Sequence, residues 1–149
     1  MSPQASRWVW SFFILVLICT AGCSMTRRSW IILDASHTTP GGMVILNFSN
    51  DEVDEYIRAF VLQKGYEIAF AEGSKDWADE ELPDDCSSLI WLAEKPGKPT
   101  ILFSSGEGKL IVSFLQKGLF PSAELKDSVN VLYRVLAAKF GGQNVRMAE

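Results

Sequence analysis

The clearest hydrophobic pattern in the chain lies between residues 49 and 65. Apolar side chains recur there at intervals of three and four, which is the spacing of one face of an amphipathic helix. These positions are Val53, Tyr56, Ile57, Phe60 and Val61. Ser49 and Glu52 have the spacing of a capping box, and Gly65 is a typical residue just past a helix end. The pattern therefore predicts a helix from about residue 50 to residue 64.

Short apolar segments lie on both sides of this helix. Met43–Phe48 (MVILNF) is almost entirely apolar, which predicts a central strand that is covered on both faces, or covered on one face and partnered on the other. Tyr66–Ala71 (YEIAFA) alternates between apolar and other residues, as a half-buried strand does. We expect a compact strand–helix–strand unit, with a right-handed crossover if the two strands are adjacent and parallel.

Three further strands are predicted in succession at Ser88–Ala93, Thr100–Ser104 and Lys109–Gln116. The connections between them contain Pro and Gly and are short, which indicates an antiparallel meander. The second connection reads Gly-Glu-Gly-Lys, but its spacing is wrong for a phosphate-binding loop and its context is a hairpin.

A second helix is predicted from about Ser122, the expected N-cap, to the Gly141-Gly142 pair. Its apolar stripe is Leu125, Val129, Leu132, Tyr133, Leu136 and Phe140. The last residues, 143–148, are typical of a short strand with Val145 and Met147 facing inward. Near the other end, residues 30–33 (WIIL) form a candidate edge strand.

These elements predict an α+β fold. The simplest way to bury both helix stripes is a two-layer sandwich, with two helices on one face of a mainly antiparallel sheet of five or six strands. The opposite face of the sheet is then expected to be open to solvent or to a partner. A ferredoxin-like variant is one version of this arrangement.

The first part of the chain has the organisation of an export signal. Phe12–Cys19 is an unbroken apolar run, preceded by Arg7 and followed by small residues. The apolar core is about a dozen residues long, shorter than the roughly 20 that span a bilayer. A retained transmembrane anchor and an ordinary cleaved leader both remain alternatives.

Ala21-Gly22-Cys23 adds a more specific signal, because it resembles the lipid-attachment site of bacterial lipoproteins. Thr20 departs from the Leu, Val or Ile that usually stands three residues before the cysteine. The resemblance implies cleavage before Cys23, and acyl chains (palmitate, for example) on that cysteine would hold the domain at a membrane. Ser24 follows, and by the same resemblance the absence of Asp there favours the outer membrane, facing the periplasm. We therefore divide the chain into a signal peptide (1–22), a tether with the candidate edge strand (23–42) and one domain (43–149).

Composition narrows the possible partners. The 149-residue chain is 48% hydrophobic, which suits a single domain, and its net charge is −4. An acidic balance argues against nucleic-acid binding, where Lys and Arg neutralise phosphates. Outside the leader and Cys23, Cys86 is the only cysteine, so no internal disulfide is expected.

Candidate functional residues are few. Trp77 lies in an acidic segment, residues 72–85, and either packs on the core or contacts a partner. That segment does not have the spacing of a calcium loop. His37 is the only histidine and is read as a loop residue. Cys86 is read as a small buried residue or, less favoured, as a nucleophile.

No catalytic triad, metal cluster or nucleotide loop is recognisable, so no cofactor or metal ion is predicted. The leading hypothesis is a non-enzymatic envelope lipoprotein that binds another protein, for example as an accessory subunit. The alternative is a lipoprotein that binds a small molecule or cell-wall fragment, or inhibits an enzyme, through a pocket between sheet and helices. Aromatic residues that fit such a pocket are Tyr66, Phe70, Trp91 and Phe114, although their spacing is equally that of an ordinary core, which is the favoured interpretation.

Overall fold

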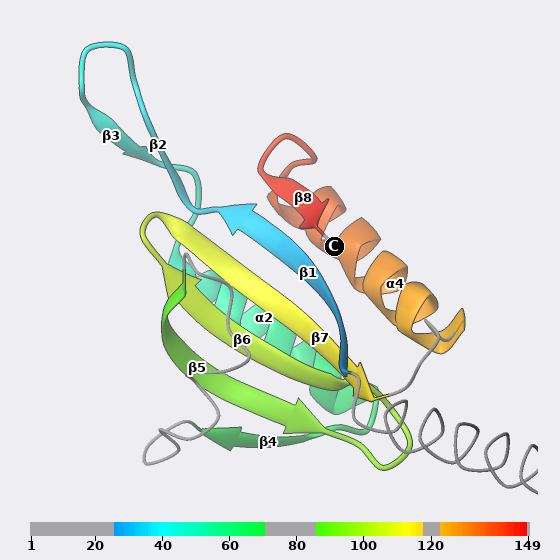
Figure 1. Cartoon of the computed structure of the whole chain (residues 1–149). Helices are drawn as coiled ribbons and strands as arrows, with labels where there is room; N and C mark the ends of the chain where they lie inside the picture. Colours follow the sequence, from blue (N-terminus) through cyan, green and yellow to red (C-terminus); the bar gives the residue numbers. More distant parts are fainter. Residues whose placement is uncertain (1–25, 71–85, 118–122, 149) are drawn as a thin grey trace, which may run out of the picture.

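The computed structural model of the chain describes residues 26–70, 86–117 and 123–148. Within these residues a six-stranded sheet carries two helices, and a separate two-stranded hairpin projects from one end (Figure 1). The strands are β1 (Thr26–Asp34), β2 (Ser36–Thr38), β3 (Val44–Leu46), β4 (Glu67–Phe70), β5 (Cys86–Glu94), β6 (Thr100–Gly106), β7 (Lys109–Lys117) and β8 (Val145–Ala148). The helices are α2 (Asn50–Gln63) and α4 (Ala123–Phe140).

The six-stranded sheet is antiparallel throughout, in the order β4-β5-β6-β7-β1-β8. The predicted meander is confirmed, because β5, β6 and β7 pair in succession. β1 is an interior strand between β7 and β8, not the edge strand predicted for residues 30–33. Residues 26–34, which were predicted to lie in the tether, therefore include a strand in the middle of the sheet.

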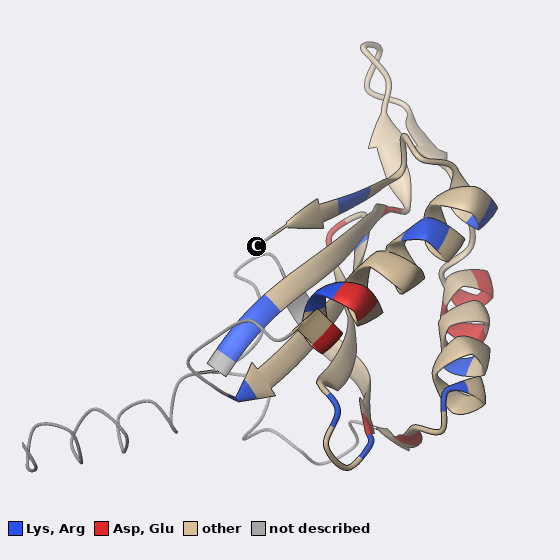
Figure 2. Ribbon diagram, turned by 90° about the vertical axis from the view of Figure 1, so that its right-hand side faces the viewer, with Lys and Arg blue, Asp and Glu red and all other residues tan. Residues whose placement is uncertain are grey.

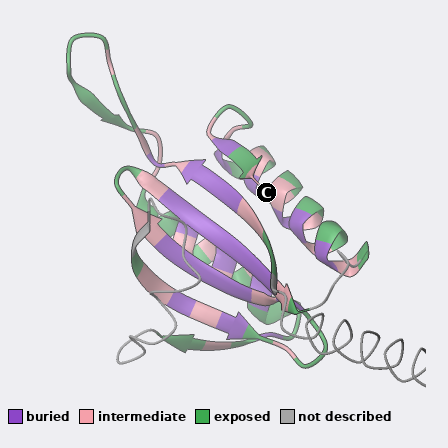
Figure 3. Cartoon of the chain, viewed as in Figure 1, coloured by how far each residue is buried: buried purple, intermediate pink, exposed green. Residues whose placement is uncertain are grey.

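Both helices pack on one face of the sheet, which confirms the predicted α+β sandwich. Along each strand alternate side chains point toward the helices, and Ile31, Trp91 and Phe103 are fully buried there. These strand side chains pack against the predicted apolar stripes of the two helices. Figure 3 shows buried positions on the strands and on both helices. The stripes contribute Val53, Ile57, Val61, Leu125, Val129, Leu132, Leu136 and Phe140.

The ends of α2 follow the sequence prediction with one exception. Ser49 is the N-cap, but its side chain makes no capping hydrogen bond, so the capping box with Glu52 is not formed. Gly65 adopts φ +85°, and the Tyr66 N–H donates to the Val61 carbonyl across it at 3.0 Å. This is the left-handed stop that glycine favours, and it turns the chain into β4.

The sheet face opposite the helices is not the open surface that the sequence predicted. Alternation places six buried side chains on it: Ile32, Leu102, Ser104, Ile111, Ser113 and Leu115. No described helix or strand lies over this face (Figure 1). The side chains at the centre of this face are buried in this structure.

Candidate functional site

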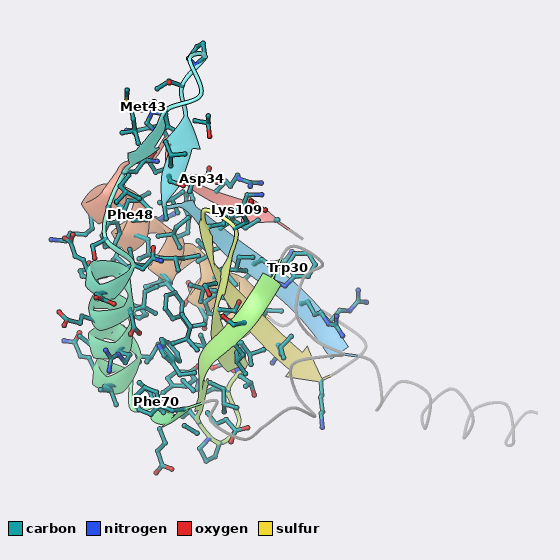
Figure 4. The ribbon with its side chains drawn as sticks, turned by 90° about the vertical axis from the view of Figure 1, so that its left-hand side faces the viewer. Trp30, Asp34, Met43, Phe48, Phe70 and Lys109 are labelled. Carbon is teal, nitrogen blue, oxygen red and sulfur yellow. The ribbon has the colours of Figure 1, made fainter. Side chains whose placement is uncertain are left out.

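The β2–β3 hairpin, with its turn at residues 39–43, is the most exposed apolar feature in the described part of the chain. Met43, Val44, Ile45 and Leu46 have exposed fractions of 67, 63, 40 and 76%. Figure 4 shows Met43 on the projecting hairpin and Phe48 where the hairpin reaches α2. Four consecutive exposed apolar side chains of this size are typical of a binding surface.

This arrangement corrects two predictions. Residues 43–48 were predicted to form a central strand, but β3 pairs only with β2, outside the six-stranded sheet. An apolar run has the same sequence pattern in a buried core strand and in an exposed binding strand, so periodicity does not distinguish these two environments. His37, predicted in a loop, lies in β2 opposite Ile45.

Asn47 fastens the base of the hairpin to the end of β1. Its Nδ2 donates to the Asp34 carbonyl at 2.8 Å, and its backbone N–H donates to the Ala35 carbonyl at 2.8 Å. Its Oδ1 lies 2.8 Å from His37 Nδ1. Because an amide oxygen only accepts, this network assigns the His37 ring proton to Nδ1. The three contacts set the direction in which the hairpin leaves the sheet.

The β6–β7 turn supports the same base. The Gly108 carbonyl accepts hydrogen bonds from the backbone N–H groups of Ala35 and Ser36, at 3.0 and 3.3 Å. Gly108 has φ +67°, and a Cβ placed on it would lie 2.8 Å from Ser36 Oγ. The positive φ therefore favours glycine at this position, and an added Cβ would also require the Ser36 hydroxyl to move.

We expect Gly108→Ala to destabilise the domain by about 1–3 kcal/mol, because a strained backbone is then combined with a steric conflict. The matched control is Gly97→Ala, at φ +73° with nothing within 4 Å of the added Cβ, which should cost about 1–2 kcal/mol from conformation alone. Urea unfolding of both variants measures the difference. Equal costs would show that the Ser36 contact contributes nothing.

The outer edge of β3 carries backbone groups without a strand partner in the described residues. The Asn47-to-Ala35 and Thr39-to-Met43 hydrogen bonds fix which residues of β3 bond to β2. In an antiparallel pair, every second residue directs its backbone N–H and C=O toward the partner strand. The N–H and C=O of Ile45 therefore face His37, whereas the N–H and C=O of Val44 and Leu46 point away from β2. The hairpin thus offers two N–H and two C=O groups as well as apolar side chains.

The hairpin is also free of formal charge. No Asp, Glu, Lys or Arg occurs from residue 35 to residue 50. Figure 2 shows charged residues on both helices and none on the projecting hairpin. A surface of this kind fits an apolar partner and not an ionic one.

A second feature is a cleft of about 260 Å³ between the two helices, at the end of the domain where α2 ends and α4 begins. Tyr66 and Phe114, two of the four aromatic residues proposed to line a pocket, line it. The other two do not: Trp91 is buried in the core, and Phe70 is exposed on the edge strand β4. Three lysines at the cleft rim, Lys64, Lys95 and Lys98, were not anticipated. They come from the C-cap of α2 and from the β5–β6 turn, and they meet only in the fold.

The remaining predicted residues are placed as follows. Cys23, Trp77 and the acidic segment 72–85 lie outside the described residues. Cys86 is the first residue of β5, and its side chain lies outside the described part. Among the described residues no three His, Cys, Asp or Glu side chains gather in a way that could hold a metal ion.

Comparison with protein-family models, with curated proteins and with solved structures found no match to this chain. A search of the described helices for a segment long and apolar enough to span a bilayer found none.

Proposed function

We propose that this protein is a non-enzymatic interaction module of the bacterial cell envelope, whose β2–β3 hairpin binds a partner protein. The observation that carries the proposal is the exposure of Met43–Leu46 on a hairpin with a well-anchored base. A lipid on Cys23 would hold the module at a membrane, and Ser24 favours the outer membrane, facing the periplasm.

The position of the hairpin supports a protein partner over the anchoring membrane. The chain enters the domain at Thr26, where β1 begins, and reaches the hairpin immediately after β1 ends at Asp34. Nine strand residues at about 3.3 Å each separate these points by about 30 Å. An anchor on Cys23, three residues before Thr26, would leave the apolar hairpin directed away from that membrane.

The partner that fits this surface supplies an extended, apolar segment. Such a segment would hydrogen-bond to Val44 and Leu46 along the outer edge of β3 and cover the exposed side chains, as in strand-addition complexes. Main-chain bonds give affinity in this mode, and the side chains give selectivity.

Leu46→Pro tests this mode of binding. Proline removes the outward N–H of residue 46 but no hydrogen bond between β2 and β3, so the hairpin should persist. We expect a loss of about tenfold or more in partner binding, because a carbonyl left unpaired in the interface costs about 1–3 kcal/mol. The readout is photo-crosslinking from a reactive residue at Val44 of the full-length protein in its native membrane.

Two controls define the result. The same photo-reactive residue at Leu62, an exposed side chain on α2 (55%), should give no discrete product. Ile45→Pro, which removes a hydrogen bond within the hairpin, should weaken crosslinking by disordering the hairpin itself. Equal products from Val44 and Leu62, or a product that Leu46→Pro leaves unchanged, would contradict the proposal.

A further inference from the structure

The cleft exists because the two helices diverge. At one end the Phe140 ring of α4 contacts Phe48 and Tyr56, with ring centroids 5.1 and 5.7 Å apart. Figure 2 shows the helices close together there and separated at the other end. The space between the separated ends is the cleft of about 260 Å³. Its apolar lining is Phe60, Tyr66, Ile101, Phe114 and Val131.

The rim of the cleft is positively charged overall. The rim carries three lysines and two acids, which leaves one net positive charge; they are Lys64, Lys95, Lys98, Glu124 and Asp127. Lys98 is paired with Glu124. Lys95 Nζ donates to the Lys64 carbonyl at 2.7 Å and keeps two further N–H donors. Within the described residues neither Lys64 nor Lys95 forms an ion pair with a carboxylate.

Tyr66 adds an unused donor to this lining. Its side chain is only 9% exposed, and its hydroxyl has no hydrogen-bond partner in the described residues. Burial raises the pKa of Tyr66 above its ordinary value of 10.0, so the hydroxyl keeps its proton at any physiological pH. The hydroxyl is not among the fully buried polar atoms that lack a partner, so it can donate to an acceptor bound in the cleft that Tyr66 lines.

We propose that this cleft binds a small amphiphilic carboxylate, with its apolar group on the aromatic floor and its carboxylate between the Tyr66 hydroxyl and the Lys64 and Lys95 ammonium groups. The single net positive charge matches a monoanion better than a phosphate dianion. A cavity of about 150 Å³ holds benzene, so a cleft of about 260 Å³ has room for one ring with a short acidic chain. This site is separate from the hairpin and does not depend on the function proposed above.

The test uses phenylpropionate as the probe and the full-length protein in detergent. Isothermal titration calorimetry should show saturable binding, and phenylpropanol, which lacks the charge, should bind at least about tenfold more weakly, because hydrogen bonds to a charged group contribute about 1.5–3 kcal/mol. Phenylpropylamine, with the opposite charge, should not bind, and phenyl phosphate should bind more weakly than phenylpropionate. Absence of saturable phenylpropionate binding, or equal binding of phenylpropanol, would overturn the proposal.

Variants locate the site. Tyr66→Phe keeps the ring and removes the hydroxyl, and we expect a loss of about two- to tenfold in phenylpropionate affinity. Lys95→Met should cost a similar or larger factor, whereas Lys139→Met, near the far end of α4 and outside the lining, should leave affinity unchanged. If a cleft variant does not fold, methyl NMR of the unaltered protein decides: phenylpropionate should shift the Ile101 and Val131 methyl signals, and shifts elsewhere only would overturn the assignment.

Discussion

Trp91→Ala is expected to destabilise the domain by about 3–5 kcal/mol, the cost of removing a large aromatic side chain from a core. Trp91 is fully buried, and its ring centroid lies 5.3 Å from that of Phe103. Its indole Nε1 donates to Asp54 Oδ1 on α2 at 2.6 Å. The same residue therefore fills the core and fastens α2 to β5.

The Asp54 carboxylate links this contact to the surface of the domain. Arg58 Nη2 lies 3.1 Å from Asp54 Oδ2, and the Arg58 guanidinium lies over the Phe70 ring at 5.8 Å. Trp91→Phe keeps an aromatic ring but leaves Asp54 without its indole donor, so we expect it to cost about 1–3 kcal/mol. Asp54→Asn, which retains an acceptor for the indole, should cost less than Trp91→Phe.

Denaturant unfolding followed by circular dichroism measures all three variants. A cost below about 1 kcal/mol for Trp91→Ala would mean that the core collapses around the missing ring. In that case Trp91 would not be the side chain that holds α2 on the sheet.

Phe140→Ala is the second large effect, also about 3–5 kcal/mol. Phe140 is the C-terminal residue of α4 and contacts a residue before α2 and one within it. Aromatic pairs of this kind contribute about 0.5–1.5 kcal/mol beyond the area they bury. Because Phe48 directly follows Asn47, loss of the ring should also loosen the base of the hairpin.

Phe140→Leu is the matched variant, since it keeps apolar volume but not the ring contacts. We expect it to recover more than half of the lost stability. Hydrogen exchange at the Asn47 amide, which donates to the Ala35 carbonyl, reports the effect on the hairpin. Unchanged exchange at Asn47 in Phe140→Ala would show that the hairpin base is independent of the helix junction.

The parts of the fold that follow from local chemistry could be predicted from the sequence. The stripe from Val53 to Val61 and the stop at Gly65 encode α2, because a helix face and its termination depend on residues close in sequence. The β5–β6–β7 meander follows for the same reason, since its turns are short and contain Gly or Pro. The class of fold then follows from the number of amphipathic elements.

The parts that depend on distant segments could not be predicted. β1 becomes an interior strand only because β7 and β8, which lie far along the chain, pair on its two sides. The apolar run at residues 43–48 does not differ in pattern from a buried strand, and the sequence did not indicate that Ile32, Leu102 and Ile111 on the second sheet face would be buried.

The two candidate sites, the cleft and the hairpin, also differ in how far each could be predicted from residues close in sequence. The spacing of Tyr66 and Phe114 favoured an ordinary core over a pocket, and both belong to the core as well as lining the cleft. No sequence pattern predicted that the rim lysines would lie together. Lys64 and Lys95 are 31 positions apart in the sequence, and the Lys95 ammonium group contacts the Lys64 carbonyl only in the fold. The hairpin as a binding element appeared only when the exposure of Met43–Leu46 was known.

Amide hydrogen exchange at β3 tests the central claim most directly. In the purified protein, the outward amides of Val44 and Leu46 should exchange quickly and the Ile45 amide, bonded to β2, slowly. In the native membrane with the partner present, we predict that the amides of Val44 and Leu46 become protected and that Ile45 changes little. Fast exchange at Val44 and Leu46 in both settings would contradict strand addition at this edge, and with it the account of the hairpin as the binding element.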